Sequence, residues 1–183
     1  MTQYLKDFKN GFNGGTRANR FEVIGSFPNG VSPQPITKFH IFSASLPAGT
    51  LGSIVIPWRG RNVFDAGDRE FQPWVVGVYD DTGNKNLWRA MRSWSAFLNK
   101  HETNKVAYNQ NAYLSDELSG GNNALLKTWT VRQLNDCNEV LKIIDLYRVW
   151  PAVVSEIPLD MGNGNAVQFP VTLSFDYFKI RNL

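Results

Sequence analysis

The sequence predicts a mainly β protein, an antiparallel β-sandwich or incomplete barrel with one flanking α-helix. Residues 167–177 alternate apolar and polar side chains, as a strand with one buried face does. Other short apolar segments are bounded by Gly, Pro, Asn and Asp, which is typical of strands joined by turns. Apolar residues recur at helical spacing convincingly in one segment, residues 84–99.

The first half of the chain is expected to be an arm followed by strands. Residues 2–11 could form a short helix, but glycines follow at once, so residues 1–20 are predicted to be a mobile N-terminal arm. Strands are expected at residues 21–27, 38–45 and 74–79, with a Pro-rich break at 28–35. The region 49–68 is predicted to be a long hairpin whose arms include 51–58 and 62–65.

The second half should contain the helix and the remaining strands. Leu87, Met91, Trp94 and Leu98 share one face of the predicted helix, and Thr82 or Asn84 could cap it. The polar segment 100–123 is predicted to be a long loop; a loop of this length inside a compact domain is usually functional or ordered by a partner, so it is a candidate interface. A hairpin is expected from strands at 125–134 and 139–150. In the closing strand 167–177, Pro170 cannot donate a hydrogen bond and favours an edge or a bulge.

Length and composition indicate one ordinary globular domain, expected over residues 21–183. The 183 residues include 19 basic and 16 acidic side chains, interspersed along the chain, which gives a formal charge of +3 without a basic stripe. Grip on nucleic acid is therefore not expected. Cys137 is the single cysteine, which excludes an internal disulfide. Neither an apolar signal core nor a membrane-spanning run is apparent, so cytoplasmic assembly is expected.

Candidate catalytic and metal-binding groups are few. His40, His101 and Cys137 lie far apart in the sequence and in no ligand spacing, so no metal, cofactor or nucleophile triad is predicted. Asp80 and Asp81 could act as acid and base of a hydrolase, but their position at a turn favours hydrogen bonding to the local backbone. The chain is predicted not to be an enzyme. A glycan-binding β-sandwich that uses exposed Trp58, Trp129 or Trp150 is the alternative of a different class.

Two ordered blocks of the sequence resemble a known family. The first is Leu46-Pro47-Ala48-Gly49, a hairpin-like stretch, then Ala66-Gly67-Asp68-Arg69-Glu70-Phe71 and Trp74. The second comprises Trp150-Pro151, the turn at 162–165, and the closing segment 169–177. Together they resemble the tail tube proteins of T4-like contractile-tailed phages, whose fold is shared with the tube protein of type VI secretion systems.

This resemblance implies a structural virion protein, assembled in the host cytoplasm. Six copies would close into a ring around a channel, with inner strands forming a continuous β-barrel, and rings would stack into a tube through which DNA passes without specific binding. Sheath, baseplate and tail terminator proteins would be its other partners. A baseplate initiator, a terminator or a secretion-type tube protein is the alternative within the class.

Contacts between subunits and between rings are predicted in the arm 2–20, the hairpin 49–68 and the loop 100–123. DNA should slide past a channel lining that is not net basic, since each contact from Lys or Arg to phosphate would hold the polymer. The residues expected at the interfaces are Tyr4, Phe8, Phe12, Leu46, Pro47, Trp58, Arg59, Arg61, Phe64, Asp68, Arg69, Tyr108 and Tyr113.

Overall fold

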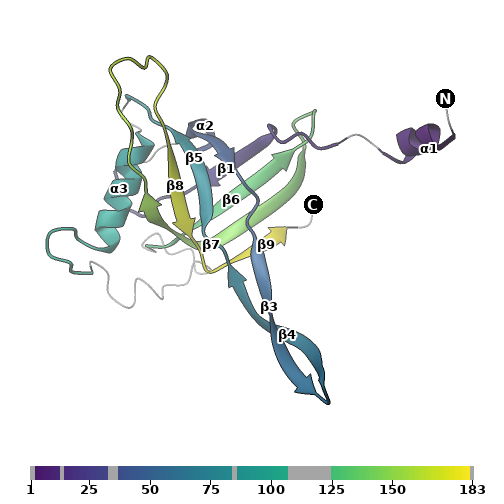
Figure 1. Ribbon diagram of the computed structural model, residues 1–183. Helices are drawn as coiled ribbons and strands as arrows, with labels where there is room; N and C mark the ends of the chain where they lie inside the picture. Colours follow the sequence, from purple (N-terminus) through teal and green to yellow (C-terminus); the bar gives the residue numbers. More distant parts are fainter. Residues whose placement is uncertain (1–2, 13–14, 33–36, 84–85, 107–124, 182–183) are drawn as a thin grey trace.

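The fold is a bent antiparallel β-structure with one flanking helix and two projections, a long hairpin and an N-terminal arm (Figure 1). The computed structural model describes residues 3–12, 15–32, 37–83, 86–106 and 125–181. Its strands are β1 (Phe21–Gly25), β2 (Ile41–Ala44), β3 (Gly49–Trp58), β4 (Arg61–Phe71), β5 (Trp74–Tyr79), β6 (Lys127–Leu134), β7 (Val140–Val154), β8 (Gln168–Ser174) and β9 (Tyr177–Arg181). Its helices are α1 (Gln3–Gly11), α2 (Thr37–His40) and α3 (Leu87–Leu98).

The strand β7 joins the two halves of the main sheet. Strands follow the order β1-β6-β7-β8-β5-β2, and β9 also pairs with β7. The first part of β7 pairs with β6 and β9, whereas its last residues pair with β8. Between these parts Arg148 has a φ of +57°, and the β6–β7 register shifts beside it. The sheet thereby bends around a core without closing into a barrel, which confirms the predicted fold class.

The closing strand has the predicted dry face. Phe169, Val171 and Leu173 of β8 are buried between the sheet halves, while Gln168 and Pro170 are exposed. Although β8 lies between β5 and β7, Pro170 stands just past the end of the β7 ladder, and its carbonyl accepts from Ser155 N at 3.3 Å. Proline has no backbone N–H, and at Pro170 no residue of β7 is positioned to accept a hydrogen bond from one.

Buried tryptophans organise the core. Trp74, Trp94 and Trp129 are at most 2% exposed, and Trp129 stacks on Trp94 with 6.5 Å between ring centroids. Each indole N–H donates to a backbone carbonyl: Trp74 to Ser45, Trp94 to Leu125 and Trp129 to Ser26, at 2.7, 2.9 and 3.1 Å. These bonds satisfy the polar atom of each ring and fix its orientation.

The helix α3 covers the core with the predicted face. Leu87, Met91 and Trp94 are fully buried, and Leu98 packs against the same cluster. The predicted caps, however, are wrong, because Asn86 is the N-cap and its Oδ1 accepts from Arg89 N at 2.8 Å. The helix also begins later than residue 84, at Leu87.

The strand predicted at 38–45 is divided into two elements. Its first residues belong to the short helix α2, and only 41–44 form β2. The reason is the buried Thr37 side chain, whose Oγ1 accepts from Gly25 N at 2.7 Å and donates to Val23 O at 2.9 Å. Thr37 thus occupies the outer edge of β1, so the chain turns there before it can continue as a strand.

The end of the chain forms a strand of its own. The sequence predicts a single strand over 167–177, but β8 ends at Ser174 and β9 starts at Tyr177. Residues 177–181 then pair with 143–147 of β7. Residues Lys179 to Arg181 are therefore part of the sheet.

Candidate assembly interface

The hairpin formed by β3 and β4, residues 49–71, projects from the body of the molecule (Figure 1). Its strands pair only with each other and form a separate two-stranded sheet. At the base, Phe71 packs against the rings of Phe175 and Phe178, with centroids 5.8 and 5.4 Å apart. Beyond this anchor the ribbon extends away from the core.

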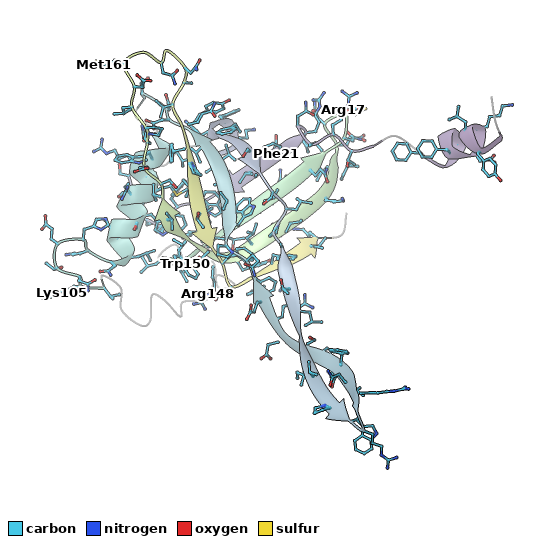
Figure 2. The ribbon with its side chains drawn as sticks, in the orientation of Figure 1. Arg17, Phe21, Lys105, Arg148, Trp150 and Met161 are labelled. Carbon is cyan, nitrogen blue, oxygen red and sulfur yellow. The ribbon has the colours of Figure 1, made fainter. Side chains whose placement is uncertain are left out.

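Both faces of the hairpin are exposed, and both carry large apolar side chains. Figure 2 shows the side chains leaving the ribbon on both sides. The apolar residues that are about half exposed or more are Leu51, Ile54, Val55, Ile56, Trp58, Val63 and Phe64. An isolated two-stranded ribbon is marginally stable in water, and a contiguous apolar surface of this kind marks an interaction site. The hairpin is therefore a candidate interaction surface.

The tip of the hairpin is basic and aromatic. Arg59 and Gly60 form the turn with φ angles of +46° and +81°. Trp58 is 62% exposed, and the Arg59 guanidinium carbon lies 5.4 Å from the centroid of its ring. Arg61 and Phe64, also predicted interface residues, follow on β4 and are exposed. The tip thus presents an exposed cation–π pair, Arg59 over Trp58, that is available to a binding partner.

Two glycines, Gly52 and Gly67, lie against each other's backbone across the hairpin. A Cβ on Gly67 would lie 3.1 Å from the carbonyl carbon of Gly52. The β3–β4 register shifts here, between Leu51 and Ser53. The absence of side chains lets the two strands approach, which twists the ribbon between its base and its tip.

The N-terminal arm also presents aromatic side chains. Tyr4, Phe8 and Phe12 are 86%, 61% and 52% exposed, and the rings of Phe8 and Phe12 stack with centroids 5.2 Å apart. Figure 1 shows α1 standing away from the sheet at the end of an extended segment. Arm and hairpin are thus two separate exposed apolar elements.

The remaining predicted interface residues lie around the hairpin base or outside the described residues. Leu46 and Pro47 precede β3, with Leu46 exposed and Pro47 half-buried. Asp68 and Arg69 lie on β4 and are exposed. Tyr108 and Tyr113, with most of the loop 100–123, fall outside the described residues. The hairpin thus brings Trp58, Arg59, Arg61 and Phe64 together at its tip, far from the aromatic rings of the arm.

The strand β9 provides a further surface that sequence reasoning missed. Within the described part of the chain, one side of β9 pairs with β7 and the other faces no strand. An unpaired strand edge can take up a strand of another molecule. The edge of β1 differs, because Thr37 bonds to Val23 and Gly25 there. No local sequence pattern predicts β9, because its position depends on long-range pairing with β7.

The loop between β7 and β8, residues 155–167, was also missed. The sequence predicts only a turn at 162–165, yet Leu159 and Met161 on the same loop are fully or almost fully exposed. Asp160 braces the loop, because its Oδ1 accepts from Gly162 N at 2.9 Å. Two large apolar residues that flank a turn-forming aspartate were the available signal.

The acidic pair considered for catalysis has a structural role. Asp80 Oδ1 accepts from Asn86 Nδ2 at 2.6 Å, and Asp81 Oδ1 accepts from Gly83 N at 3.1 Å. The Gly83 bond, and then the hydrogen bond from His40, hold the pKa of Asp81 below its ordinary value. A lowered pKa favours a permanently ionised turn residue over a proton donor.

Among the described residues, the three tryptophans considered for glycan binding do not form one exposed surface. Trp129 is fully buried and Trp150 is packed against the core, so of the three tryptophans only Trp58 is exposed. Across the described ranges, no three His, Cys, Asp or Glu side chains gather as metal ligands. No helix in the described part of the chain is long and apolar enough to cross a membrane.

Comparison with curated sequences gives two relatives that match over nearly the whole length of the chain and one that matches over most of it. Tail tube protein gp19 of Enterobacteria phage T4 and that of Enterobacteria phage T6 are each 30% identical over 181 residues, which covers 96% of this chain and 99% of each relative. The tail tube protein of Serratia phage KSP90 is 28% identical over 151 residues, 79% of this chain and 76% of the relative. No protein-family model matches the chain.

Solved structures share the fold at low sequence identity. The sheath/tube terminator of an extracellular contractile injection system, PVC, has a TM-score of 0.63 at 14% identity, with 93% of this chain and 99% of that chain covered. A sheath-tube complex of the PVC system gives 0.59 at 13% identity, with 100% and 99% covered. The baseplate of the anti-feeding prophage gives 0.64 at 14% identity, with 93% and 97% covered. Terminator, tube and baseplate structures score alike, so fold alone does not distinguish these roles.

Proposed function

The chain belongs to the tail tube protein family of contractile-tailed phages and is a structural component of the virion tail; from this we propose that it forms stacked hexameric rings whose channel conducts DNA. The proposed partners are further copies of the chain, the surrounding sheath, and the baseplate and terminator at the two ends of the tube. No catalytic step belongs to this role. Six copies per ring is the number that the family resemblance implies.

The observation that supports a self-assembling role most strongly is the exposed hairpin. Its apolar side chains point out on both faces, from Leu51 near the base to Phe64 beyond the turn. Covering them removes apolar surface from water at about 25 cal/mol per Å². A repeating neighbour provides such cover for every copy at once, because contacts between unlike surfaces propagate through an assembly.

Ring closure is proposed to use the unpaired edge of β9. Residues 177–181 offer main-chain groups to a strand of the adjacent copy, which would extend the sheet from one subunit to the next. The outer edge of β1 is closed to such pairing at Val23 and Gly25 by Thr37. Because Thr37 blocks β1, the strand that β9 meets must come from another part of the adjacent copy, a contact between unlike surfaces of the kind that a ring requires.

The proposed channel lining is the outer face of β1, β6, β7 and β9. Val23, Val131 and Leu146 point into the core. The residues that alternate with them along the strands lie on the other face of the sheet, which is this outer face. The charged members of this outer face are Glu22, Arg132, Asp145, Lys179 and Arg181. Three of these residues are basic and two are acidic, so the face has a net charge of +1, slightly more basic than the lining expected from the sequence. Both signs are present and Arg181 is paired with Asp145, so the face offers no continuous basic stripe to phosphate.

The test is electron microscopy of the purified chain across a range of concentrations. The wild type is expected to form six-fold rings and tubes. Replacing residues 53–66 with Asn-Gly keeps Gly52 and Phe71 and supplies a favoured two-residue turn. We expect this variant to remain folded by circular dichroism but to form no tubes. Deletion of residues 2–15 tests the arm separately and should shorten or abolish the tubes.

A point change on the hairpin provides the matched control. Thr50→Ser alters an exposed residue near the base and leaves the apolar surface intact, so it should assemble as the wild type does. Tubes of normal length from the 53–66 replacement would contradict the role of the hairpin. A wild-type chain that stays monomeric at every concentration would contradict the main-tube role.

A further inference from the structure

The loop 155–167 and the hairpin tip lie at opposite ends of the molecule (Figure 1). We propose that they bind each other between copies: the tip, Trp58 to Arg61, of one subunit enters the pocket beside the loop of a subunit in the next ring. This inference rests on the proposed stacking of rings and names the surface that receives the hairpin.

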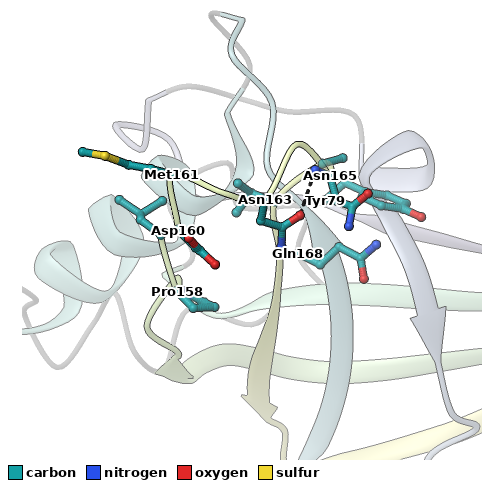
Figure 3. A pocket seen from close by; sticks show the side chains of 10 residues that line it. Tyr79, Pro158, Asp160, Met161, Asn163, Asn165 and Gln168 are labelled. Atoms are coloured by element: carbon teal, nitrogen blue, oxygen red, sulfur yellow. Dashed lines mark hydrogen bonds between the residues drawn. The ribbon is translucent and has the colours of Figure 1, made fainter.

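The pocket lies between the two limbs of the loop. Pro158 and Asp160 stand on one limb, and Tyr79 and Gln168 line the opposite side (Figure 3). It is a pocket open to solvent with a volume of about 830 Å³, within the range of roughly 300–1,000 Å³ that holds drug-sized ligands. An indole ring and a guanidinium group are smaller than such ligands, so the tip can be accommodated.

The receiving loop is held in shape before any partner arrives. Gly162 N donates to Asp160 Oδ1 at 2.9 Å, and Asn163 N donates to Asp160 O at 3.2 Å. Asn165 N donates to Asn163 Oδ1 at 3.0 Å, the dashed line in Figure 3. A preorganised loop loses little conformational entropy on binding.

Charge and polarity match across the proposed contact. Residues 55–64 at the tip contain two arginines and no acidic residue, whereas residues 155–168 contain Glu156 and Asp160 and no basic residue. The apolar parts also correspond, because Trp58 on one side meets Pro158, Leu159 and Met161 on the other. Arg59 and Asp160 are the central opposite charges of this contact.

The placement of the two surfaces decides what they can assemble. Since they lie at opposite ends, one molecule cannot bring its own tip to its own loop. A contact between unlike surfaces at opposite ends propagates along an axis and stays open at both ends. This is the geometry of a tube that grows by adding rings, and it leaves one end with free tips and the other with free loops.

The first test is a charge cycle that preserves the loop. Asp160→Asn removes the charge but keeps the oxygen that Gly162 N needs. Arg59→Glu is expected to raise the concentration at which tubes form by about tenfold or more, because like charges then meet. In the Asp160→Asn background the same reversal should cost several-fold less, since the repulsion is gone. Lys142→Glu, a charge reversal at an exposed residue near the β6–β7 turn and outside both surfaces, should leave assembly unchanged.

The second test is a disulfide between copies. Asn62→Cys and Met161→Cys chains, both carrying Cys137→Ser, are mixed and oxidised; we expect cross-linked dimers of one chain with the other. Asn62→Cys mixed with a chain that retains Cys137 is the control, because Cys137 lies in the β6–β7 turn and should not cross-link.

The outcomes separate this contact from the proposed function. Additive effects in the charge cycle, or no cross-link within tubes of the wild-type form, overturn the contact while ring stacking stands. If the chain forms neither rings nor tubes and no cross-link appears at any concentration, both are overturned. Non-additivity together with a selective Asn62→Cys to Met161→Cys cross-link supports the contact.

Discussion

Arg181, the last described residue, binds the carboxylate of Asp145 near the middle of β7, with 2.9 Å between Nε and Oδ2. Asp145 is only 4% exposed, and its other oxygen accepts from Thr130 Oγ1 at 2.7 Å. A buried carboxylate requires such partners, because removing a charge from water without them is costly. This ion pair ties β9 to the sheet.

Arg181→Ala should therefore destabilise the subunit by about 1–3 kcal/mol, since it leaves a buried acceptor without its charged donor. Urea denaturation at a concentration where the chain is monomeric measures the change. Arg181→Lys, which keeps the charge and loses the forked geometry, should lie between wild type and alanine. Arg69→Ala on the exposed hairpin is the control and should stay within about 0.5 kcal/mol. Equal stability of Arg181→Ala and wild type would show that the pair contributes nothing.

Arg148 combines a positive φ with an ion pair. Its Nε lies 2.9 Å from Asp176 Oδ2, while its backbone occupies a region that glycine adopts more readily. Arg148→Ala loses the pair and keeps the backbone cost, so we expect a loss of about 1–2 kcal/mol. Arg148→Gly loses the pair but relieves the strain and should be more stable than alanine. Thermal unfolding of the two variants decides this; the reverse order would contradict the strain.

Gly25 lies against the central indole of the core. A Cβ there would come within 2.3 Å of the Trp129 ring, a distance at which the indole must move. Gly25→Ala should cost about 1–3 kcal/mol through overpacking. It should also shift the tryptophan fluorescence, because the ring stacks on Trp94. Gly164→Ala, with no atom within 4 Å of the added carbon, is the matched control. Unchanged fluorescence and stability in Gly25→Ala would refute the close approach.

Asp81 should contribute to stability against acid. Its pKa is lowered in the folded state, first by the Gly83 amide and then by His40. A lowered folded pKa stabilises the fold above the ordinary value of about 3.9, and this contribution is lost as the pH falls through the folded value. Asp81→Asn should therefore flatten the decline of stability below about pH 4. Chemical denaturation at several pH values measures it, and an unchanged slope would contradict the expectation.

His40→Gln separates the two causes of that lowered pKa. Because the Gly83 hydrogen bond is the largest single cause and remains in the variant, His40→Gln should keep part of the acid dependence. Loss of the whole dependence in His40→Gln would instead assign the effect to the imidazole.

Much of the fold could be predicted from local patterns. The alternation around Phe169 and Val171 and the helical face of Met91 and Trp94 are local signals, and both sets of residues are buried as expected. The hairpin followed from its flanking glycines and prolines. The class of protein followed from two sequence blocks in order, and the relatives confirm it.

The missed features depend on contacts between distant residues. Thr37 delays the start of the strand predicted at 38–45 because its hydroxyl bonds to β1, and nothing in residues 38–45 signals that partner. The strand β9 exists because β7 is long enough to pair with it, and Trp129 is buried because Gly25 admits its ring. Exposure of Met161 likewise depends on where the β7–β8 loop leaves the sheet.

The two exposed apolar faces of the hairpin also affect subunits that do not assemble. If neighbouring subunits cover the apolar side chains of the ribbon, the fraction of molecules in which the ribbon is stably folded rises with subunit concentration. A lone copy exposes this ribbon to proteases and holdase chaperones, whereas an incorporated copy withdraws it. Under the proposed assembly, we expect host proteases to cleave free subunits in this ribbon sooner than subunits built into a tail, so the exposed hairpin would mark incomplete assembly.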